Sequence, residues 1–379
     1  MPPHGRHLWT VAKRFFPLQQ NKACLLDSGS SGGYNWSDNL TNPRAKWQMR
    51  TALMGGPNRN PVYRIVCTDE TSDGEIERRI VEGAGHLFFY RPCQTAEELE
   101  PAGKDADALL VGSVRVDGEL LREWERLKVL CSYSTGVDHI DLAAATALGI
   151  WVCNAGDYCS EEVADHTMAL ILAAWRHLIP FREDIRRGIW RYDSAGAILP
   201  LQGAVLGLVG LGRIGRRVAQ RAQAFGMRVI GYDPYVSDVP GVERVPFEEL
   251  LARSDIVSLH LPGRPEEPAL LDAAAFSRMK EGAWVVNVSR PSLIDLEAAR
   301  AALATGRLGG LALDVWDPEP PLAPDPLFEH PRVLVTPHAG WFSIRSNALV
   351  RERVAQEAVR VLAGELPHYA VNRPPEPRL

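Results

Sequence analysis

Short apolar runs alternate with amphipathic stretches along most of the chain, from residue 62 onward. Four runs in the first part predict strands: VYRIVCT, ALLVG, KVLCSY and GIWVCN. Six more follow in the second part: AVLGLV, MRVIGY, IVSLHL, AWVVNV, LALDVW and VLVT. Because strands that alternate with helical patterns are typical of βαβ units, the pattern predicts an α/β protein with parallel sheets.

Three helices can be predicted together with their ends. The stretch SEEVADHTMALILAAWRHL is apolar on most faces and predicts a buried helix that Ser160 caps. Asp295 and Gly306 bracket LEAARAALAT as N-cap and C-terminal glycine. A last helix is predicted over residues 344–363.

Length favours two domains, because a single hydrophobic core stops growing at roughly 250 to 300 residues and this chain has 379. Residues 1–61 are rich in Gly, Ser and Asn and sustain no helical or strand period. We expect them to form an irregular N-terminal extension.

Composition excludes several classes of partner. A formal net charge of -5, with 23% charged residues, gives no strong field to attract nucleic acid or an acidic membrane surface. The sequence has no apolar stretch of transmembrane length and no apolar signal-peptide region. Its six cysteines form no CxxC pair and favour buried free thiols over disulfides or a metal site. These features predict a cytoplasmic protein of the size of an enzyme, without a bound metal.

The stretch GLVGLGRIG carries Gly210, Gly212 and Gly215 in GxGxxG spacing, after a predicted strand and at the start of a predicted helix. Such glycines allow a tight turn, close approach to a pyrophosphate, and close helix packing. The next predicted strand ends at Asp233, whose carboxylate can hold the ribose hydroxyls and would repel a 2′-phosphate. The loop therefore predicts NAD rather than NADP.

The alternative is an ordinary glycine turn with Asp233 as a helix cap. The expected cofactor contacts in this loop also include Arg213 and Ile214.

Three polar residues follow three successive predicted strands: Arg290, Glu319 and His338. In a parallel sheet, ligands bind outside the carboxyl ends of the strands, so these side chains are expected at the edge that carries the glycine loop. His338 could donate a proton to a carbonyl oxygen, Glu319 could orient the imidazole, and Arg290 could bind a carboxylate. Taken singly, each has a structural alternative: a core histidine, or an ordinary ion pair.

The motifs NVSRPSLID, LALDVWDPEPP and TPHAGW, together with the glycine loop, resemble those of the D-isomer-specific 2-hydroxyacid dehydrogenases over residues 63–372. The resemblance implies two Rossmann-like domains with doubly wound parallel sheets and an active site in the interdomain cleft. It assigns residues 62–157 and 341–372 to a substrate-binding domain and 158–340 to an NAD-binding domain. It also implies a homodimer through the cofactor domain.

The resemblance further implies roles for single residues. Arg290, Glu319 and His338 would be catalytic, and Asp314 would contact the nicotinamide carboxamide. The loop YSTGVDHID would bind the substrate carboxylate through the Gly136 backbone. The expected substrate contacts are Thr135, Gly136, Arg290 and Trp341.

Within this family, RAQAFGMRVIGYDPYVSD and HAGWFS are similar to the C-terminal binding protein branch, whose members bind NAD and act as transcriptional corepressors. The chain also departs from the family. Pro291 follows Arg290, which restricts Arg290 to extended backbone. Gly112 and Ser132 stand where some relatives place a carboxylate-binding arginine.

Three functions stay open at this point. The first is an NAD-dependent oxidoreductase that interconverts a 2-oxo acid and a D-2-hydroxy acid, with His338 as general acid and base. The second is an NAD(H)-responsive, corepressor-like binding protein. The third is a dehydrogenase of a phosphonate or phosphite, for which Arg115 is the candidate cation in the first domain.

Overall fold

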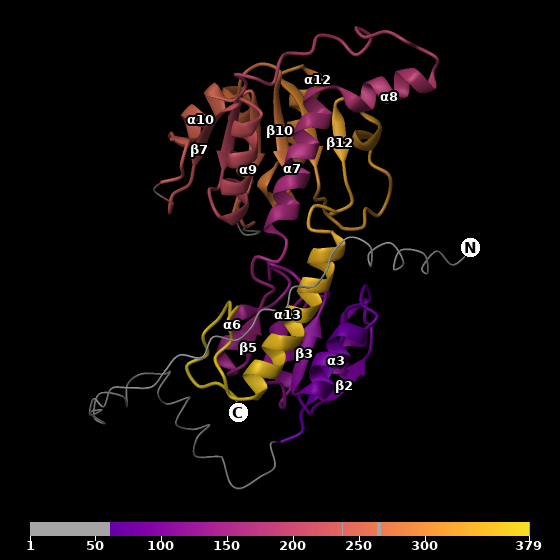
Figure 1. The fold of residues 1–379 in the computed structure, drawn as a ribbon, viewed down its shortest axis with the longest axis vertical. Coiled ribbons are helices and arrows are strands. Elements are labelled where there is room, and N and C mark those ends of the chain that lie inside the picture. Colours follow the sequence, from indigo (N-terminus) through magenta and orange to yellow (C-terminus); the bar gives the residue numbers. More distant parts are fainter. Residues whose placement is uncertain (1–60, 237, 264–266, 379) are drawn as a thin grey trace, which may run out of the picture. The chain divides into compact units, whose positions relative to one another are not determined.

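The computed structural model describes residues 61–236, 238–263 and 267–378. The extension predicted for residues 1–61 lies, up to Asn60, outside the described residues. The described chain forms two parallel β-sheets, each with helices on both faces (Figure 1). The α/β fold class predicted from the sequence is confirmed.

The first sheet has five parallel strands in the order β2-β1-β3-β4-β5. Its strands are β1 (Arg64–Cys67), β2 (Leu87–Tyr90), β3 (Ala108–Val111), β4 (Val129–Ser132) and β5 (Trp151–Cys153). Strand β2 was not predicted from the sequence. This is an edge strand whose Leu87 is 48% exposed, so its pattern lacks the continuous burial that marks β3 and β4.

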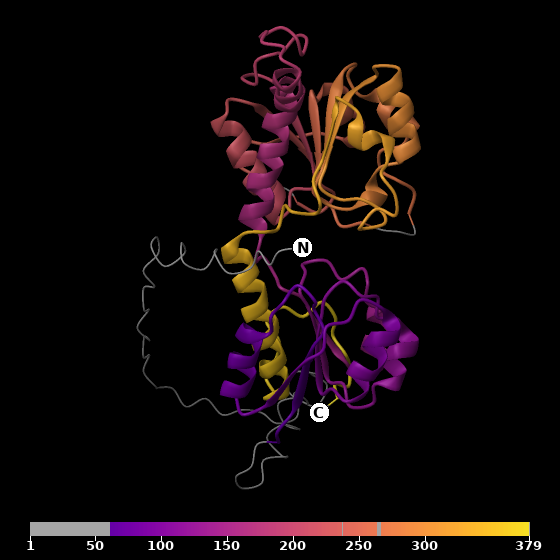
Figure 2. The ribbon, with the colours of Figure 1, turned by 90° about the vertical axis from the view of Figure 1, so that its right-hand side faces the viewer.

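Helices cover both faces of the first sheet, as Figure 2 shows. One face packs against α3 (Glu75–Gly83) and α13 (Ile344–Leu362). The other packs against α4 (Ala96–Lys104), α5 (Gly118–Glu123) and α6 (Leu142–Ala147) around the fully buried Trp124. The last helix was predicted within one residue of its observed ends.

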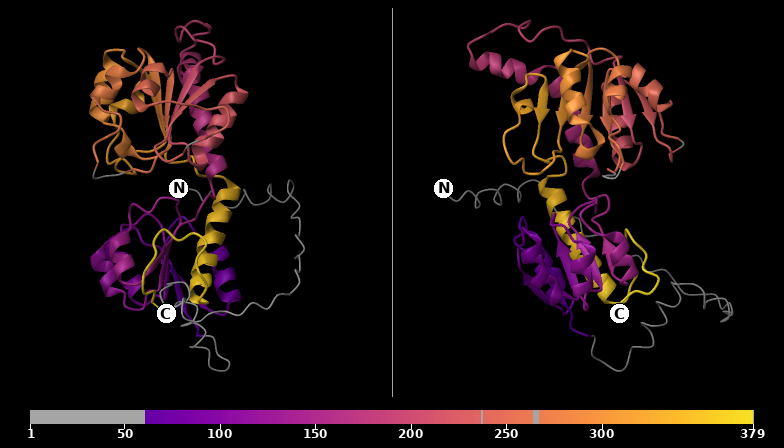
Figure 3. Two further views of the ribbon diagram at one scale, coloured as in Figure 1. Left: turned by 90° about the vertical axis from the view of Figure 1, so that its left-hand side faces the viewer. Right: turned by 180° about the vertical axis from the view of Figure 1, so that it is seen from behind.

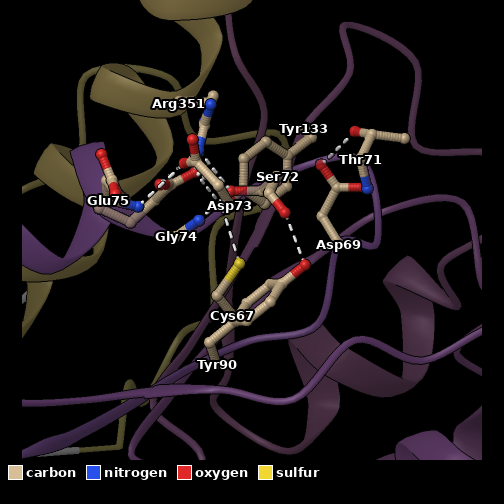
Figure 4. A network of polar contacts seen from close by, with 11 residues as sticks. Cys67, Asp69, Thr71, Ser72, Asp73, Gly74, Glu75, Tyr90, Tyr133 and Arg351 are labelled. Carbon is tan, nitrogen blue, oxygen red and sulfur yellow. Dashed lines mark hydrogen bonds and ion pairs between the residues drawn. The ribbon is translucent and has the colours of Figure 1, made fainter. Parts of the chain in front are cut away.

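A buried polar network joins α13 to this sheet (Figure 4). Arg351 donates from Nε to Glu77 Oε1 at 3.1 Å and from Nη2 to Ser72 Oγ at 2.8 Å. Tyr133, directly after β4, donates its hydroxyl to the same Glu77 oxygen at 2.8 Å. The Cys67 thiol lies 3.2 Å from that hydroxyl, and burial raises the pKa of the thiol to about 12. The network fixes the start of the loop that follows β4.

The second sheet has seven parallel strands in the order β12-β11-β10-β9-β6-β7-β8 (Figure 3). Its strands are β6 (Val205–Val209), β7 (Arg228–Tyr232), β8 (Glu243–Arg244), β9 (Ile256–Leu259), β10 (Ala283–Asn287), β11 (Leu308–Leu313) and β12 (Val333–Val335). The two-residue edge strand β8 is too short to show a pattern and was not predicted. The strand order reverses at β6, so the loop after β6 lies at the topological switch point where such sheets bind ligands.

Helices α7 (Ser160–Trp175) and α9 (Arg213–Ala224) pack on one face of this sheet. The other face carries α10 (Phe247–Arg253), α11 (Ala273–Arg278) and α12 (Leu296–Ala304). Asp295 caps α12 by accepting from the Ala298 N–H, as predicted. The predicted cap of α7 is wrong: Cys159 is the N-cap residue, and its carbonyl accepts from the Val163 N–H at 2.9 Å while Ser160 begins the helix.

The C-terminal residues return to the first sheet after α13. Val371 donates its N–H to the Val152 carbonyl at 2.9 Å, and Asn372 Oδ1 accepts from the Val152 N–H at 2.8 Å. These contacts support the proposed grouping of residues 62–157 with 341–372, apart from 158–340, which stays a prediction. In the described part of the chain, no helix has the length and apolar character needed to span a membrane.

Candidate active site

The glycine loop after β6 has the geometry that a bound pyrophosphate needs. Gly210 has a φ of 98°, and a side chain there would overlap the His260 carbonyl. A Cβ on Gly215 would overlap the Gly210 carbonyl, whereas one on Gly212 would meet nothing of the described chain within 4 Å. Helix α9 begins at Arg213, so the free N–H groups of its first turn adjoin the open side of Gly212. The loop therefore fits a dinucleotide phosphate.

Asp233 follows β7 and is 6% exposed. Its Oδ2 accepts from the Leu211 N–H at 2.8 Å, and its Oδ1 accepts from the N–H groups of Tyr235 and Val236 at 2.8 and 3.0 Å. Burial alone would raise the pKa of Asp233, but these hydrogen bonds keep the pKa below its ordinary value. An ionised carboxylate thus stands beside the glycine loop, where the sequence analysis expected it. The ribose contact itself stays a prediction.

His260 lies against the same loop, since a side chain on Gly210 or Gly215 would contact it. Its Nε2 lies 2.9 Å from Ser258 Oγ, and its buried Nδ1 has no hydrogen-bond partner within the described residues. Burial lowers the pKa of His260 to about 3. The imidazole is therefore neutral at physiological pH and adds no charge to the loop.

His338 and Glu319 form a hydrogen-bonded pair beyond the carboxyl ends of β12 and β11. His338 Nδ1 lies 2.6 Å from Glu319 Oε2, and Glu319 Oε1 accepts from the Trp316 N–H at 2.8 Å. Burial alone would raise the pKa of Glu319, but the hydrogen bond from His338 and the one from Trp316 lower it. The carboxylate is therefore ionised and can only accept, so Nδ1 carries a proton and Nε2 is left for a reacting group.

The hydrogen bond to Glu319 raises the pKa of His338, against the opposing effect of burial. Its side chain stays 47% exposed. A histidine with these features can hold a proton and give it to a molecule that reaches it from outside.

Asp314 follows β11 and is 2% exposed. Its Oδ1 accepts from the Thr336 hydroxyl at 2.6 Å and from the Ala339 N–H at 2.9 Å, and its Oδ2 accepts from the Gly340 N–H at 2.8 Å. Burial would raise the pKa of Asp314, but hydrogen bonds from His166, Thr336 and the backbone lower it. The carboxylate is thus largely occupied in holding the segment around His338.

Arg290 lies beyond the end of β10 in extended backbone, with φ -140° and ψ 140°, as its position before Pro291 predicts. Its Nη1 donates to the Ser289 carbonyl at 2.8 Å, and its Nε donates to Asp138 Oδ2 at 2.5 Å. Its Nη2 lies so close to Gly136 that any side chain on that glycine would overlap it. Arg290 and the loop after β4 therefore come together, as the sequence analysis expected.

The remaining predicted contacts lie in two loops. Thr135 donates its hydroxyl to the Gly156 carbonyl at 3.0 Å, which leaves the Gly136 backbone facing Arg290. Trp341 packs at 6.2 Å from Tyr158, between ring centroids, and at 5.4 Å from the half-exposed Phe342. Trp341 therefore packs between two aromatic rings, and its contact with a substrate stays a prediction.

Ser132 and Gly112 stand where some relatives place a carboxylate-binding arginine, and the structure shows what surrounds each of them. Ser132 is fully buried, and its hydroxyl lies 2.8 Å from Ser134 Oγ. A side chain on Gly112 would meet the Asp69 carboxylate at 3.1 Å. Neither position supplies a cation.

Two residues near the site carried no functional assignment from the sequence. Asp138 forms an ion pair with Arg290. His166 Nε2 lies 3.0 Å from Thr336 Oγ1 and 3.2 Å from Asp314 Oδ1. No spacing in the sequence reveals these contacts, because each joins segments more than a hundred residues apart.

Comparisons with known proteins agree with this geometry. The family described as "D-isomer specific 2-hydroxyacid dehydrogenase, NAD binding domain" matches residues 168–340. A D-3-phosphoglycerate dehydrogenase of Methanocaldococcus jannaschii is 41% identical over 323 residues, which are 84% of this chain and 61% of that protein. The chain thus spans about three fifths of that relative.

Two solved structures share the fold. The TT0316 protein of Thermus thermophilus has a TM-score of 0.75 and 37% identity, covering 81% of this chain and 99% of that one. A D-lactate dehydrogenase of Aquifex aeolicus, solved with NAD and lactic acid, has a TM-score of 0.75 and 28% identity, covering 82% and 99%.

Proposed function

The chain belongs to the D-isomer specific 2-hydroxyacid dehydrogenase family and has its NAD-binding domain, and we propose that it interconverts a 2-oxo acid and a D-2-hydroxy acid. The observation that carries the proposal is the hydrogen bond of 2.6 Å between His338 and Glu319 beside the carboxyl ends of the strands. This histidine is exposed, Glu319 binds one of its ring nitrogens, and the other has no partner among the described residues, which favours proton transfer over a structural role.

When bound, the reduced nicotinamide supplies a hydride to the carbonyl carbon of the substrate. His338 would hold the proton that the developing alkoxide needs and donate it from Nε2. Glu319 would keep Nδ1 protonated and favour the charged imidazole. In the reverse direction, the neutral imidazole would accept the proton of the hydroxyl.

Arg290 would bind the substrate carboxylate with its guanidinium fork, next to the Gly136 backbone. Nε of Arg290 donates to Asp138, whereas Nη2 lies next to Gly136. Nη2 is therefore the group of this side chain that we expect to meet the substrate beside Gly136. Thr135 would support this loop and Trp341 would bound the substrate's side chain. An Asp314 contact to the nicotinamide carboxamide stays a prediction, since most of the acceptor positions of that carboxylate are taken.

The name of the Methanocaldococcus relative raises the question of a phosphorylated substrate. The strand order of the first sheet reverses between β1 and β3, and the residues beyond those strands include Asp69 and Gly112, an acid and a residue without a side chain. Arg351 and Arg353 nearby are paired with acids. We therefore propose a substrate without a second anion. Arg115 is exposed in the same sheet's loops, so phosphorylated and phosphonate compounds belong in the test.

We also propose that the chain forms a homodimer with a second copy of itself. None of the described residues of α8 (Leu178–Arg186) is buried, and Trp190 and Tyr192 beyond it are 86% and 92% exposed. A short helix with no buried residue gains little stability by itself, which favours a homodimer through this segment. The homodimer and the cytoplasmic location stay predictions.

The test is a screen of 2-oxo acids with NADH, followed by its absorbance, with chiral analysis of the product. The panel includes pyruvate, branched and aromatic 2-oxo acids, 3-phosphohydroxypyruvate and phosphonopyruvate. Replacing His338 with Ala should slow turnover of the best substrate by about 100- to 10,000-fold. The matched control is His368→Ala, an exposed histidine outside the site, which should keep full turnover.

Full activity of the His338→Ala variant would reject the assignment of the proton donor. Tight NADH binding without turnover of any compound would instead favour the NAD(H)-responsive binding protein. Preference for phosphonopyruvate or 3-phosphohydroxypyruvate would overturn the proposed substrate class alone.

A further inference from the structure

Helix α7 is fixed firmly to the helix of the glycine loop. Glu161 accepts from Arg217 Nε at 2.5 Å and from Arg221 Nη2 at 2.7 Å, and Asp165, one turn later, accepts from Arg221 Nε at 2.6 Å. The two acids and the two arginines are each four residues apart, so they form matched rows on α7 and α9. The apolar face of α7 packs on β10, β11 and β12.

The neighbouring face of α7 contacts the segment that carries His338. His166 Nε2 lies 3.0 Å from Thr336 Oγ1 and 3.2 Å from Asp314 Oδ1. One turn earlier, Glu162 accepts from the Ser343 hydroxyl at 2.9 Å. The helix therefore contacts this segment on both sides of the imidazole.

The direction of these hydrogen bonds follows from what each group can donate. The Thr336 hydroxyl has one proton, which it donates to Asp314 at 2.6 Å. Its lone pairs are then left to accept, and the ionised Asp314 can only accept. His166 must therefore carry its proton on Nε2 and donate it to this pair.

His338 has a φ of 51°, a left-handed conformation that is strained for a residue with a side chain. Such a conformation persists only where the surroundings hold it. Asp314 holds the two N–H groups that follow, those of Ala339 and Gly340. A Cβ on Gly340 would meet Asp314 Oδ2 at 2.7 Å and His166 Cδ2 at 3.2 Å, so this turn packs directly on both side chains.

We propose that His166 is a positioning residue for His338: by donating to Thr336 and Asp314 from a fixed helix, it keeps the strained turn and its imidazole aligned with Glu319. His166 does not touch the reacting atoms. The kinetic part of this inference rests on the proposed function, but the alignment of the imidazole can be measured without substrate.

The direct test is an NMR titration of labelled histidines in His166→Ala and in the wild-type protein, with the His338 signal identified by His338→Ala. Three groups set the His338 pKa besides burial: Glu319 and Asp314 raise it, and Arg290 lowers it. Since the hydrogen bond to Glu319 is the largest of these, looser alignment should shift the His338 pKa downward. Turnover of the best 2-oxo acid should fall about 10- to 100-fold, as for a reacting group displaced by about 1 Å.

Three further variants separate positioning from general damage. His166→Gln keeps an N–H donor and should restore the pKa of His338 and the turnover. Arg176→Ala, at the exposed C-terminal end of the same helix, should change neither. Thr336→Val removes the bridging hydroxyl from the other side and should reproduce His166→Ala, which decides the matter if His166→Ala does not fold.

An unchanged His338 pKa in folded His166→Ala would overturn the inference. So would a loss of turnover that His166→Gln does not restore. If the wild-type protein reduces no 2-oxo acid, the proposed function fails, while the shift of the His338 pKa still decides on the role of His166.

Discussion

The protein holds two acid–base pairs of opposite character, one at each sheet. Arg351 and Glu77 lie inside the first sheet's network, with side chains 8% and 0% exposed. His338 and Glu319 lie at the edge of the second sheet, with side chains 47% and 36% exposed. Both pairs are hydrogen-bonded, so their difference is one of surroundings rather than of contact.

The surroundings decide what each pair can do. Burial alone would lower the pKa of Arg351, and its pairing with Glu77 and Asp73 raises it. Removing Glu77 would leave the buried Arg351 with only the half-exposed Asp73, and removing Arg351 would leave the buried Glu77 without a cation. The exposed pair can exchange a proton with a molecule from outside. Disrupting the first pair should therefore affect stability, whereas disrupting the second should affect activity.

The largest effect is expected from Glu77→Ala. It leaves the buried Arg351 without its main partner, which should lower the free energy of unfolding by about 3–5 kcal/mol. Chemical denaturation measures this change. The double variant Glu77→Leu with Arg351→Met removes both charges and should recover most of the loss.

The control for Glu77→Ala lies on the same helix. Glu82 pairs with Arg78 at 3.0 Å, four residues away, with both side chains about half exposed. Glu82→Ala should change the free energy of unfolding by less than about 0.5 kcal/mol. Equal losses in Glu77→Ala and Glu82→Ala would show that burial does not separate these two pairs.

The next effect is kinetic and concerns Glu319→Gln. The amide keeps the shape of the carboxylate but removes its charge, so the pKa of His338 should fall. Reduction of the 2-oxo acid needs the protonated imidazole, and its rate should fall as the pH rises through that pKa. In Glu319→Gln this decline should begin at lower pH, with turnover near pH 7 reduced about 10- to 100-fold.

The measurement is the pH profile of turnover for the wild-type protein and the variant. Glu329→Gln is a suitable control, because this glutamate belongs to the short helix η2 (Pro326–Glu329) rather than to the pair. A profile whose decline stays at the same pH in Glu319→Gln would contradict the role of the carboxylate.

The contrast between buried and exposed positions also explains how much of the fold and of the candidate site could be predicted from the sequence. Strands β10 and β11, which precede Arg290 and Glu319, were predicted because central parallel strands are buried on both faces and appear as unbroken apolar runs. Strand β12, which precedes His338, is an edge strand, but its three residues are all apolar and were predicted for that reason. The missed strands, β2 and β8, are edges where half of the burial is absent. Arg290, Glu319 and His338 could be placed at one edge because strand ends in a parallel sheet share a side.

The partners of these residues could not be predicted. Arg290 binds Asp138, and His166 binds Asp314 and Thr336, through contacts that depend on how distant segments pack. The pairing of Arg351 with Glu77 could not be predicted either, because in the sequence each looks like an ordinary charged residue on a helix. Periodicity shows which face of an element is buried but not which polar group meets it there.

The smallest expected effect is the contribution of His338 and Glu319 to stability. The pKa of His338 is raised on folding, so its contribution is present below its unfolded pKa and is lost as the pH rises through the folded value. The pKa of Glu319 is lowered, so its contribution is present above its unfolded pKa and is lost as the pH falls. The pair should therefore stabilise the fold most between about pH 4.5 and 6.5, the ordinary pKa values of the two groups. Because both side chains are more than a third exposed, we expect the pair to contribute less than about 1 kcal/mol to the free energy of unfolding.

Unfolding free energies of wild-type and His338→Ala protein across pH 4 to 9 measure this contribution. A difference that grows towards pH 9 would have the wrong sign for an imidazole held in its charged form.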